Sequence, residues 1–179
     1  FIISNQIIQR SKTPFTLKSG KTSNIYVNWR NIANDAYLMN ELTDFVLAFA
    51  SDQSIKVDTF YGVAEGATKL GILTQFKYAQ QTNYTTGSHT LAMGRAKPKE
   101  HGDPKDRYFV GEPTGEICIL EDVTTTGGSL INCIQQLQGK KLNISAAIGL
   151  TNRDEFRDDG KTVKEALSEL SIPYYEMSN

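Results

Sequence analysis

The sequence predicts an α/β fold with a mostly parallel, doubly wound sheet and a small N-terminal hood over its carboxyl edge. Segments of strand-like residues alternate with longer amphipathic segments, as in parallel sheets covered by helices. Residues Ile117–Leu120 form a continuous apolar run, which suits a strand buried on both faces. With 179 residues and 39% hydrophobic content, we expect a single domain over residues 1–179.

The first half of the chain contains one strongly patterned helix, from about Ala36 to Ala50. Its apolar residues recur at helical spacing, and Asn34 or Asp35 is suited to cap its start. The other elements expected here are an amphipathic helix carrying Ile2, Ile3, Ile7 and Ile8, short β pieces at Phe15–Leu17 and Ile25–Trp29, a strand Val57–Val63, a helix from about Ala67 to Gln80, and a strand His89–Met93.

The second half continues the alternation of strands and helices. After the apolar strand at residues 117–120 we expect a helix over Leu130–Gln138, a strand Ser145–Leu150, a helix Thr162–Ser171 and a closing strand Tyr174–Met177. The C-terminal strand and roughly residues 1–35 are expected to form the hood. The only cysteines, Cys118 and Cys133, lie in apolar surroundings, so we expect neither a disulfide nor a zinc site.

Charge and hydropathy exclude several classes of function. The net charge of −1 and the pI near 6.2 argue against a general nucleic-acid binder, because affinity for phosphate backbones depends on accumulated positive charge. No run of eighteen apolar residues predicts a membrane span. The N-terminal residues FIISNQIIQR are too short and too polar for a secretory signal, so we expect a cytoplasmic location and no membrane partner.

Residues 117–129, ICILEDVTTTGGS, join a buried strand to two acids and a glycine turn before a helix. Ligands of parallel sheets bind beyond the carboxyl ends of strands, and Gly127–Gly128 allows backbone N–H groups to converge on an anion. Glu121 and Asp122 would repel a phosphate unless sugar hydroxyls or Mg²⁺ lay between them. The pattern predicts a ribose-phosphate site; the alternative is an ordinary turn with solvated acids.

The same thirteen residues resemble the phosphoribosyl pyrophosphate (PRPP) signature of type I phosphoribosyltransferases, with Glu121–Asp122 in place of the commoner Asp-Asp. They match neither a Walker A loop nor a GxGxxG fingerprint. The resemblance implies the type I phosphoribosyltransferase fold and Mg²⁺ as a cofactor held mainly through PRPP, with no metal site of the protein's own. The PRPP-binding residues that it implies within the motif are Glu121, Asp122, Thr124, Thr125, Thr126, Gly127, Gly128 and Ser129.

A basic segment, RAKPKEHG, carries Arg95, Lys97, Lys99 and His101. Such cations can neutralise a departing pyrophosphate, although a run of charges is also typical of a solvated turn. The segment resembles the catalytic loop of orotate phosphoribosyltransferases, which implies catalytic roles for these four residues together with Asp122. Ala96 stands where that family usually has its first lysine, and Lys97 is displaced from it by one position.

Three further segments resemble orotate phosphoribosyltransferases. FTLKSG implies that Lys18 contacts PRPP and that Tyr26 and Val27 in the following β piece contact orotate. GVAEGATKLG implies that Lys69 binds PRPP, and GLTNRDEF implies that Arg153 binds the orotate carboxylate. Taken without the resemblance, these segments equally suit a surface hairpin, a packing turn with a solvated lysine, and an ion pair of the arginine with its acidic neighbours.

The resemblance covers nearly the whole chain and implies transfer of ribose 5-phosphate from PRPP to orotate, in pyrimidine biosynthesis. The products would be orotidine 5′-monophosphate and pyrophosphate. It also implies a homodimer in which the basic loop crosses to the neighbouring site. Two alternatives remain open at this point: a phosphoribosyltransferase acting on a purine base, and a regulator that senses PRPP or a nucleotide without turnover.

Overall fold

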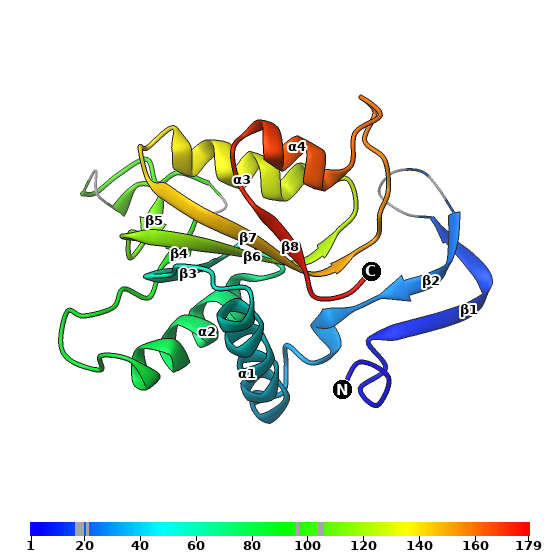
Figure 1. Ribbon diagram of the computed structural model, residues 1–179, viewed down its shortest axis with the longest axis horizontal. Helices are drawn as coiled ribbons and strands as arrows, with labels where there is room; N and C mark the ends of the chain where they lie inside the picture. Colours follow the sequence, from blue (N-terminus) through cyan, green and yellow to red (C-terminus); the bar gives the residue numbers. More distant parts are fainter. Residues whose placement is uncertain (17–19, 21, 96, 104–105) are drawn as a thin grey trace.

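The computed structural model describes residues 1–16, 20, 22–95, 97–103 and 106–179. Its centre is a four-stranded parallel sheet with two helices on each face (Figure 1), which confirms the predicted doubly wound α/β fold. The strand order is β3 (Thr59–Gly62), β6 (Glu116–Thr124), β7 (Asn143–Asn152) and β8 (Tyr174–Glu176). On one face lie α1 (Ala36–Asp52) and α2 (Thr68–Gln81), and on the other α3 (Gly128–Gln138) and α4 (Val163–Glu169).

Strand β6 divides the hydrophobic core into two layers. Ile117 and Ile119 pack on the side of α3 and α4, whereas Cys118 and Leu120 pack on the side of α1 and α2. All four residues are fully buried, as expected from a strand whose successive side chains point to opposite faces. Burial raises the pKa of the Cys118 thiol, so this cysteine is a neutral core residue at physiological pH.

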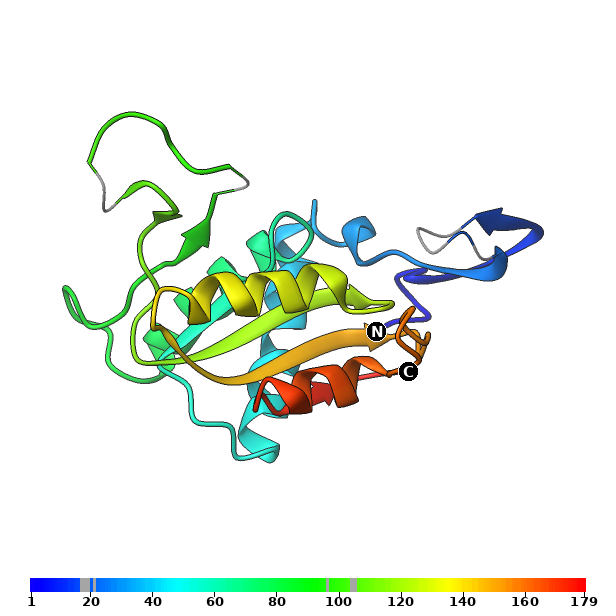
Figure 2. The ribbon, with the colours of Figure 1, turned by 90° about the horizontal axis from the view of Figure 1, so that it is seen from above.

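The hood consists of an antiparallel hairpin, β1 (Ile8–Thr16) and β2 (Thr22–Val27), followed by a 3-10 turn, η1 (Trp29–Asn31). It lies beyond the carboxyl ends of the sheet strands (Figures 1 and 2). The Trp29 indole Nε1 donates a hydrogen bond to Thr151 Oγ1 at 3.0 Å, which ties the base of the hood to β7. A small separate hairpin, β4 (Met93–Gly94) and β5 (Phe109–Val110), lies at the opposite end of the sheet.

Helix α1 begins where the sequence predicts. The Asp35 carboxylate accepts a hydrogen bond from the Leu38 amide at 2.9 Å and caps the helix. Helix α2 and strands β3, β6, β7 and β8 also lie within a few residues of their predicted bounds. The local patterns were therefore sufficient for the elements that build the central sheet and its covering helices.

Two predicted elements were wrong. No N-terminal helix forms: residues 2–6 make turns, and Ile8 already pairs with Val27 in the hood hairpin. The spacing of the four isoleucines fits a helix, but pairing with β2 satisfies a longer stretch of backbone. Of the strand predicted at His89–Met93, only Met93 belongs to a strand, β4, and the His89 ring is hydrogen bonded to Thr82 and Ser88 beside the end of α2.

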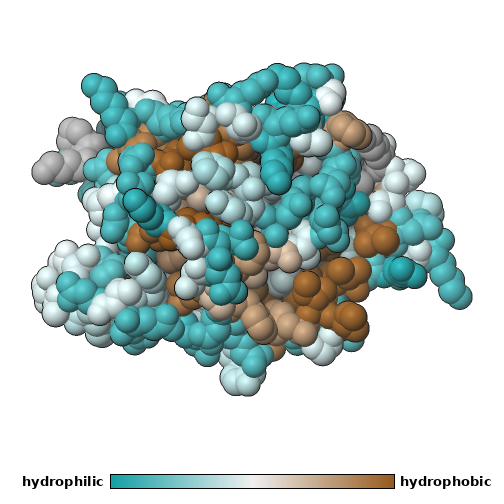
Figure 3. Space-filling view, in the orientation of Figure 1, coloured by the Kyte–Doolittle hydropathy of each residue, from teal (hydrophilic) through white to brown (hydrophobic). Residues whose placement is uncertain are grey.

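An apolar surface lies beside the N-terminal segment and α1 (Figure 3). A cavity of about 600 Å³ opens there, and its wall includes Ile3, Phe45 and Met177. Ile3 is 88% exposed and Phe45 49%. None of the helices in the described ranges combines the length and the apolar character that crossing a membrane requires.

Candidate active site

Two cavities meet at the carboxyl end of β6. The loop cavity, about 680 Å³, is lined by residues 123–129 and 156–159, and the hood cavity, about 610 Å³, by hood residues, the turn after β3 and the end of β6. Both cavities share four lining residues: Glu121, Val123, Thr125 and Ser129. The arrangement suits an elongated ligand whose middle would lie over the strand end and whose two ends would occupy separate compartments.

The two predicted acids lie at this junction. Glu121 is only 6% exposed and lines both cavities, while Asp122 lines the hood cavity. The Asp122 Oδ1 accepts a hydrogen bond from the Val123 amide at 2.9 Å. Gly66, in the turn after β3, lies so close that an added Cβ would meet the Asp122 carboxylate at 2.8 Å. The lack of a side chain at Gly66 is therefore what lets this turn approach the acid.

The glycine turn leaves the start of α3 available to an anion. Gly127 adopts φ +71°, and no side chain caps the helix there. An added Cβ at Gly127 would also meet Val163 at 3.0 Å. The first N–H groups of a helix lack intrahelical partners and attract anions. Thr125, Thr126 and Ser129 add hydroxyl groups to the same cavity wall.

Thr124 differs from the other hydroxyl residues of the motif. It is 2% exposed, and its hydroxyl is hydrogen bonded to the Tyr174 hydroxyl and to the Thr151 carbonyl. Burial raises the pKa of Tyr174 to about 12, so the phenol is neutral at physiological pH. The Thr124 hydroxyl therefore serves to join β6, β7 and β8, although the residue borders the loop cavity.

The hood cavity contains aromatic rings and an arginine. The Tyr26 and Phe15 rings lie 5.4 Å apart, and Val27 lies beside them on the cavity wall. Arg153 Nη1 donates to the Ile25 carbonyl at 3.3 Å, and its Nε lies 3.4 Å from Glu155 Oε1. The side chains of this ion pair are 14% and 12% exposed, so the pair is largely withdrawn from solvent. Such a cavity suits a planar ring that carries an anionic group.

Several predicted site residues do not line either cavity. Lys69 Nζ donates to the Ala33 carbonyl at 3.0 Å. Arg95 Nε donates to the Asp106 carbonyl at 2.9 Å, and the described part of the basic loop lies at the far end of the sheet from the hood (Figure 2). The other residues of that loop absent from both cavity walls are Lys97, Lys99 and His101. Lys18 lies outside the described residues.

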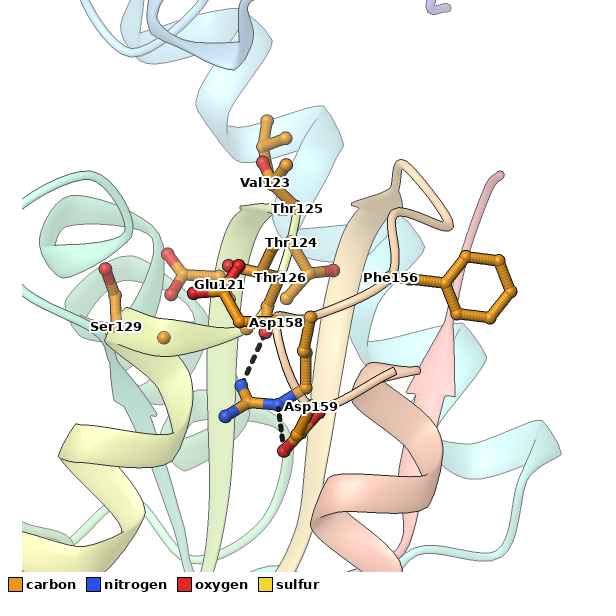
Figure 4. Close-up of a pocket in the computed structure, with 12 residues that line it drawn as sticks. Glu121, Val123, Thr124, Thr125, Thr126, Ser129, Phe156, Asp158 and Asp159 are labelled. Atoms are coloured by element: carbon orange, nitrogen blue, oxygen red, sulfur yellow. Dashed lines mark hydrogen bonds and ion pairs between the residues drawn. The ribbon is translucent and has the colours of Figure 1, made fainter. Parts of the chain in front are cut away.

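Two arginines that the sequence prediction did not assign do line the cavities. Arg30, at the end of the hood, borders the hood cavity, and Arg157 borders the loop cavity. Figure 4 shows the loop cavity, with Phe156 turned away from it and a guanidinium joined by dashed lines to Thr126 and Asp159. The sequence offered one signal for Arg157: it follows Arg153 by four residues and lies in a loop that ends in Asp159–Gly160, close to the predicted site.

The acids at the cavity junction also bear on metal binding. Within the described ranges, no group of three or more His, Cys, Asp or Glu residues is arranged to hold a metal ion. Mg²⁺ commonly binds through one or two carboxylates together with phosphate oxygens of the substrate and water. Asp122 and Glu121 supply oxygen donors of that kind, so the residues present fit an ion held mainly by a bound phosphate compound.

Known proteins with this sequence pattern identify the family. An orotate phosphoribosyltransferase of Rhodopseudomonas palustris is 31% identical over 183 residues, which cover 97% of this chain and 87% of the relative. The chain belongs to the orotate phosphoribosyltransferase family. A relative with the same name from Methylococcus capsulatus is 27% identical and covers 98% of this chain and 79% of its own length. No family model matches the sequence.

A solved structure of this family has the same fold over nearly the whole length of this chain. The crystal structure of orotate phosphoribosyltransferase from Aeropyrum pernix superposes with a TM-score of 0.74 at 21% sequence identity. The superposition covers 99% of this chain and 90% of that one. The type I phosphoribosyltransferase fold predicted from the sequence is therefore confirmed. The prediction that the C-terminal strand joins the hood was wrong, because that strand is β8 and pairs with β7 in the central sheet.

Proposed function

We propose that this protein transfers ribose 5-phosphate from PRPP to orotate, forming orotidine 5′-monophosphate and pyrophosphate in pyrimidine biosynthesis. The observation that carries the proposal is the junction of the two cavities at Glu121 and Asp122. The start of α3 lies on one side, and the Arg153 guanidinium lies on the other. One substrate molecule that carries a phosphate, a diol and a reactive carbon, together with one planar anionic base, accounts for both compartments.

The loop cavity is the proposed site of the 5-phosphate. The first N–H groups of α3, the hydroxyls of Thr125, Thr126 and Ser129, and the backbone of Gly127 and Gly128 would bind its oxygens. Glu121 and Asp122 would accept hydrogen bonds from the ribose hydroxyls, which separate the acids from the phosphate. Thr124 would contribute by position only, since its hydroxyl is bonded to Tyr174 and Thr151.

The hood cavity is the proposed site of orotate. Tyr26 and Val27 would lie against the pyrimidine ring, and Arg153 would hold the orotate carboxylate. The contact of Arg153 with Glu155 orients the guanidinium before the substrate arrives. This leaves the attacking ring nitrogen directed toward the junction, where the anomeric carbon of PRPP would lie.

The chemical step breaks the bond between the anomeric carbon and the pyrophosphate oxygen, and that oxygen keeps the bonding electron pair. Orotate N1 supplies the pair that forms the new bond to the same carbon, and the proton that N1 carried passes to the departing pyrophosphate or to water. Positive charge develops on the sugar and negative charge on the pyrophosphate, so charge stabilisation dominates over covalent catalysis. Mg²⁺, held mainly by PRPP oxygens beside Asp122, would supply positive charge to the leaving group.

The basic loop is the proposed source of the remaining positive charge. The described part of this loop lies at the end of the sheet away from the hood, and Arg95, Lys97, Lys99 and His101 line neither cavity of their own chain. Both observations support a homodimer whose loops cross to the neighbouring site. Lys18 and Lys69 are also proposed to bind PRPP. Lys69 would have to exchange its bond with the Ala33 carbonyl for one with the substrate.

The domain and compartment are part of the same proposal. We assign residues 1–179 to a single phosphoribosyltransferase domain, supported by a hood that is hydrogen bonded to the central sheet through Trp29. We also propose a cytoplasmic location. The free thiols of Cys118, which is buried, and of Cys133, which is half-buried, support it, because free cysteines are typical of reducing compartments.

Pyrophosphate release tests the activity. The protein is incubated with PRPP and Mg²⁺ and with either orotate or a panel of purine bases, and pyrophosphate is measured over time. We expect release with orotate and none with purines. If pyrophosphate is released with purines but not with orotate, the substrate is a purine base. If PRPP binds but no base causes release of pyrophosphate, the protein is a sensor.

A further inference from the structure

Arg157 is hydrogen bonded to the backbone of the glycine turn. It lies in the loop between β7 and α4, and its Nη1 donates to the Thr126 carbonyl at 2.8 Å. Its Nε lies 3.4 Å from Asp159 Oδ2. The dashed lines of Figure 4 show both contacts on the wall of the loop cavity. The Arg157 side chain therefore joins the α4 loop to the middle of the glycine turn.

This bond fixes one peptide plane of the glycine turn. The carbonyl of Thr126 and the N–H of Gly127 belong to the same planar, trans peptide, so holding the carbonyl also sets the direction of the N–H. Gly127 then turns at φ +71° into the start of α3. The guanidinium thus orients the turn from which the proposed phosphate-binding N–H groups project.

The loop that carries Arg157 is itself held by short-range hydrogen bonds. The Arg157 amide donates to the Lys161 carbonyl at 3.0 Å, and the Gly160 amide donates to the Arg157 carbonyl at 3.0 Å. The Lys161 N–H and then the Arg157 side chain hold the pKa of Asp159 below its usual range, so Asp159 is a carboxylate at neutral pH. The guanidinium is consequently oriented before any ligand binds.

The charges around the cavity give Arg157 a second role. Among the described residues that line the loop cavity, it is the only cation, whereas Glu121, Asp158 and Asp159 are acids. The neighbouring Lys161 points its ammonium to Glu169 at 2.5 Å and does not line the cavity. Without the guanidinium, a doubly charged phosphate would meet a wall whose charged side chains are all acids, so Arg157 reduces the repulsion.

We propose that Arg157 is a positioning residue for the 5-phosphate of PRPP: it holds the Thr126–Gly127 peptide in place and offsets the acids of the loop cavity. The inference rests on the proposed function, because it assigns the 5-phosphate to this cavity. It extends the binding set beyond the thirteen-residue motif to a loop about thirty residues later in the sequence.

Calorimetric titration with ribose 5-phosphate tests the role, using wild type, Arg157→Gln and Arg157→Lys, with Lys161→Gln as the matched control from the same loop. We expect Arg157→Gln to weaken ribose 5-phosphate binding by roughly tenfold or more, the usual effect of losing a hydrogen bond from a charged group. Arg157→Lys should lose less, since it keeps the charge. Lys161→Gln should bind as wild type does.

Kinetics on the whole enzyme supply the readout that a merely structural role would not change. Arg157→Gln should raise the KM for PRPP while the inhibition constant of pyrophosphate stays as in wild type, because pyrophosphate occupies the other end of the substrate. If both ligands weaken equally, the residue acts on overall folding and the inference is overturned. Should Arg157→Gln fail to fold, Arg157→Lys decides by the same comparison.

The two proposals fail in different ways. If wild type does not bind ribose 5-phosphate at all, the assignment of the loop cavity and with it the proposed function is wrong. If wild type binds it and Arg157→Gln and Arg157→Lys bind it equally well, the proposed function stands and the role of Arg157 is refuted.

Discussion

The glycine turn and the basic loop are two regions proposed to bind anionic groups, and they differ in how firmly the fold supports them. The turn joins β6 to α3, and the residues on either side of it, Leu120 and Leu130, are fully buried. The basic loop connects β4 and β5, which are strands of two residues each. The proposed sugar-phosphate site is therefore built into the core, whereas the cations proposed for catalysis are held by a small hairpin at the far end of the sheet.

The difference has a physical reason. A site that binds a ground-state phosphate gains from N–H groups whose directions are fixed in advance. Cations that stabilise a departing pyrophosphate must also let the product leave, and loops with few buried contacts open at low cost. We therefore expect substitutions in the basic loop to affect turnover alone, and substitutions in the glycine turn to affect stability as well as binding.

Lys99→Ala is expected to have the largest effect. Removing one group that stabilises transition-state charge typically lowers kcat by roughly 10²–10³-fold, and the melting temperature should stay unchanged because Lys99 lies outside the core. Steady-state kinetics and thermal unfolding measure the two quantities, with the exposed Lys56→Ala as control. A large fall in melting temperature would contradict the separation between the two regions.

Mixing inactive subunits tests where the basic loop acts. If loops cross between subunits, an equimolar mixture of Lys99→Ala and Asp122→Asn re-forms one intact site in each mixed dimer and recovers about a quarter of wild-type activity. The measurement is activity after the two proteins are unfolded and refolded together. Absence of recovery in a mixture shown to contain mixed dimers would place the loop over its own chain's site.

Arg153→Ala tests whether the hood cavity, like the glycine turn, binds its substrate through a group that the fold already holds in place. Losing a charge-assisted contact to the orotate carboxylate should raise the KM for orotate roughly 10–100-fold and leave the KM for PRPP close to that of wild type. Initial rates at varied concentrations of each substrate separate the two constants. Arg10→Ala, an exposed hood arginine that lines neither cavity, is the control.

Gly127→Ala should destabilise the folded protein by about 1–2 kcal/mol, because alanine is strained at positive φ and its Cβ would press on Val163. Denaturant unfolding measures the loss. Gly128→Ala is the matched stability control, since nothing lies within 4 Å of a Cβ there. Equal stability of the two variants would mean that the turn is less fixed than its contacts indicate.

Glu165→Gln should give the smallest effect, and one that depends on pH. The Thr162 backbone N–H and then its hydroxyl lower the pKa of Glu165 from 4.5, within the capping box of α4. A carboxyl group whose pKa is lower in the folded state stabilises the protein when the pH lies above the pKa of the unfolded state. This stabilisation disappears as the pH falls through the folded pKa. The unfolding midpoint of the variant should therefore lie below that of wild type at pH 7 and match it at acid pH, whereas Glu112→Gln should match it throughout.

Local patterns predicted the elements whose partners are close in sequence or fully buried. The apolar run at Ile117–Leu120 became β6, and the Asp35 carboxylate caps α1 at the expected place. The signature motif likewise placed Glu121 at the junction of the cavities, because strand, acid and turn follow one another directly. In each case a short stretch of chain contains the whole physical cause.

Contacts between distant segments could not be predicted in this way. The isoleucines at positions 2–8 fit a helix until β2 provides a pairing partner about twenty residues later. The Lys69 ammonium reaches the carbonyl of Ala33, and Arg157 reaches Thr126, and nothing within either local segment specifies such a partner. The resemblance to a family supplied roles for individual residues, but not the bonds they make in the absence of substrate.

The indole at the base of the hood makes the protein its own optical probe. Trp29 is the only tryptophan in the sequence, it lines the hood cavity, and its ring nitrogen is bonded to Thr151 on the sheet. The wavelength and intensity of its fluorescence depend on the water around the ring and on the hydrogen bond to Thr151. Arrival of a base, or lifting of the hairpin from the strands, can therefore be followed in real time by intrinsic fluorescence, without any attached label.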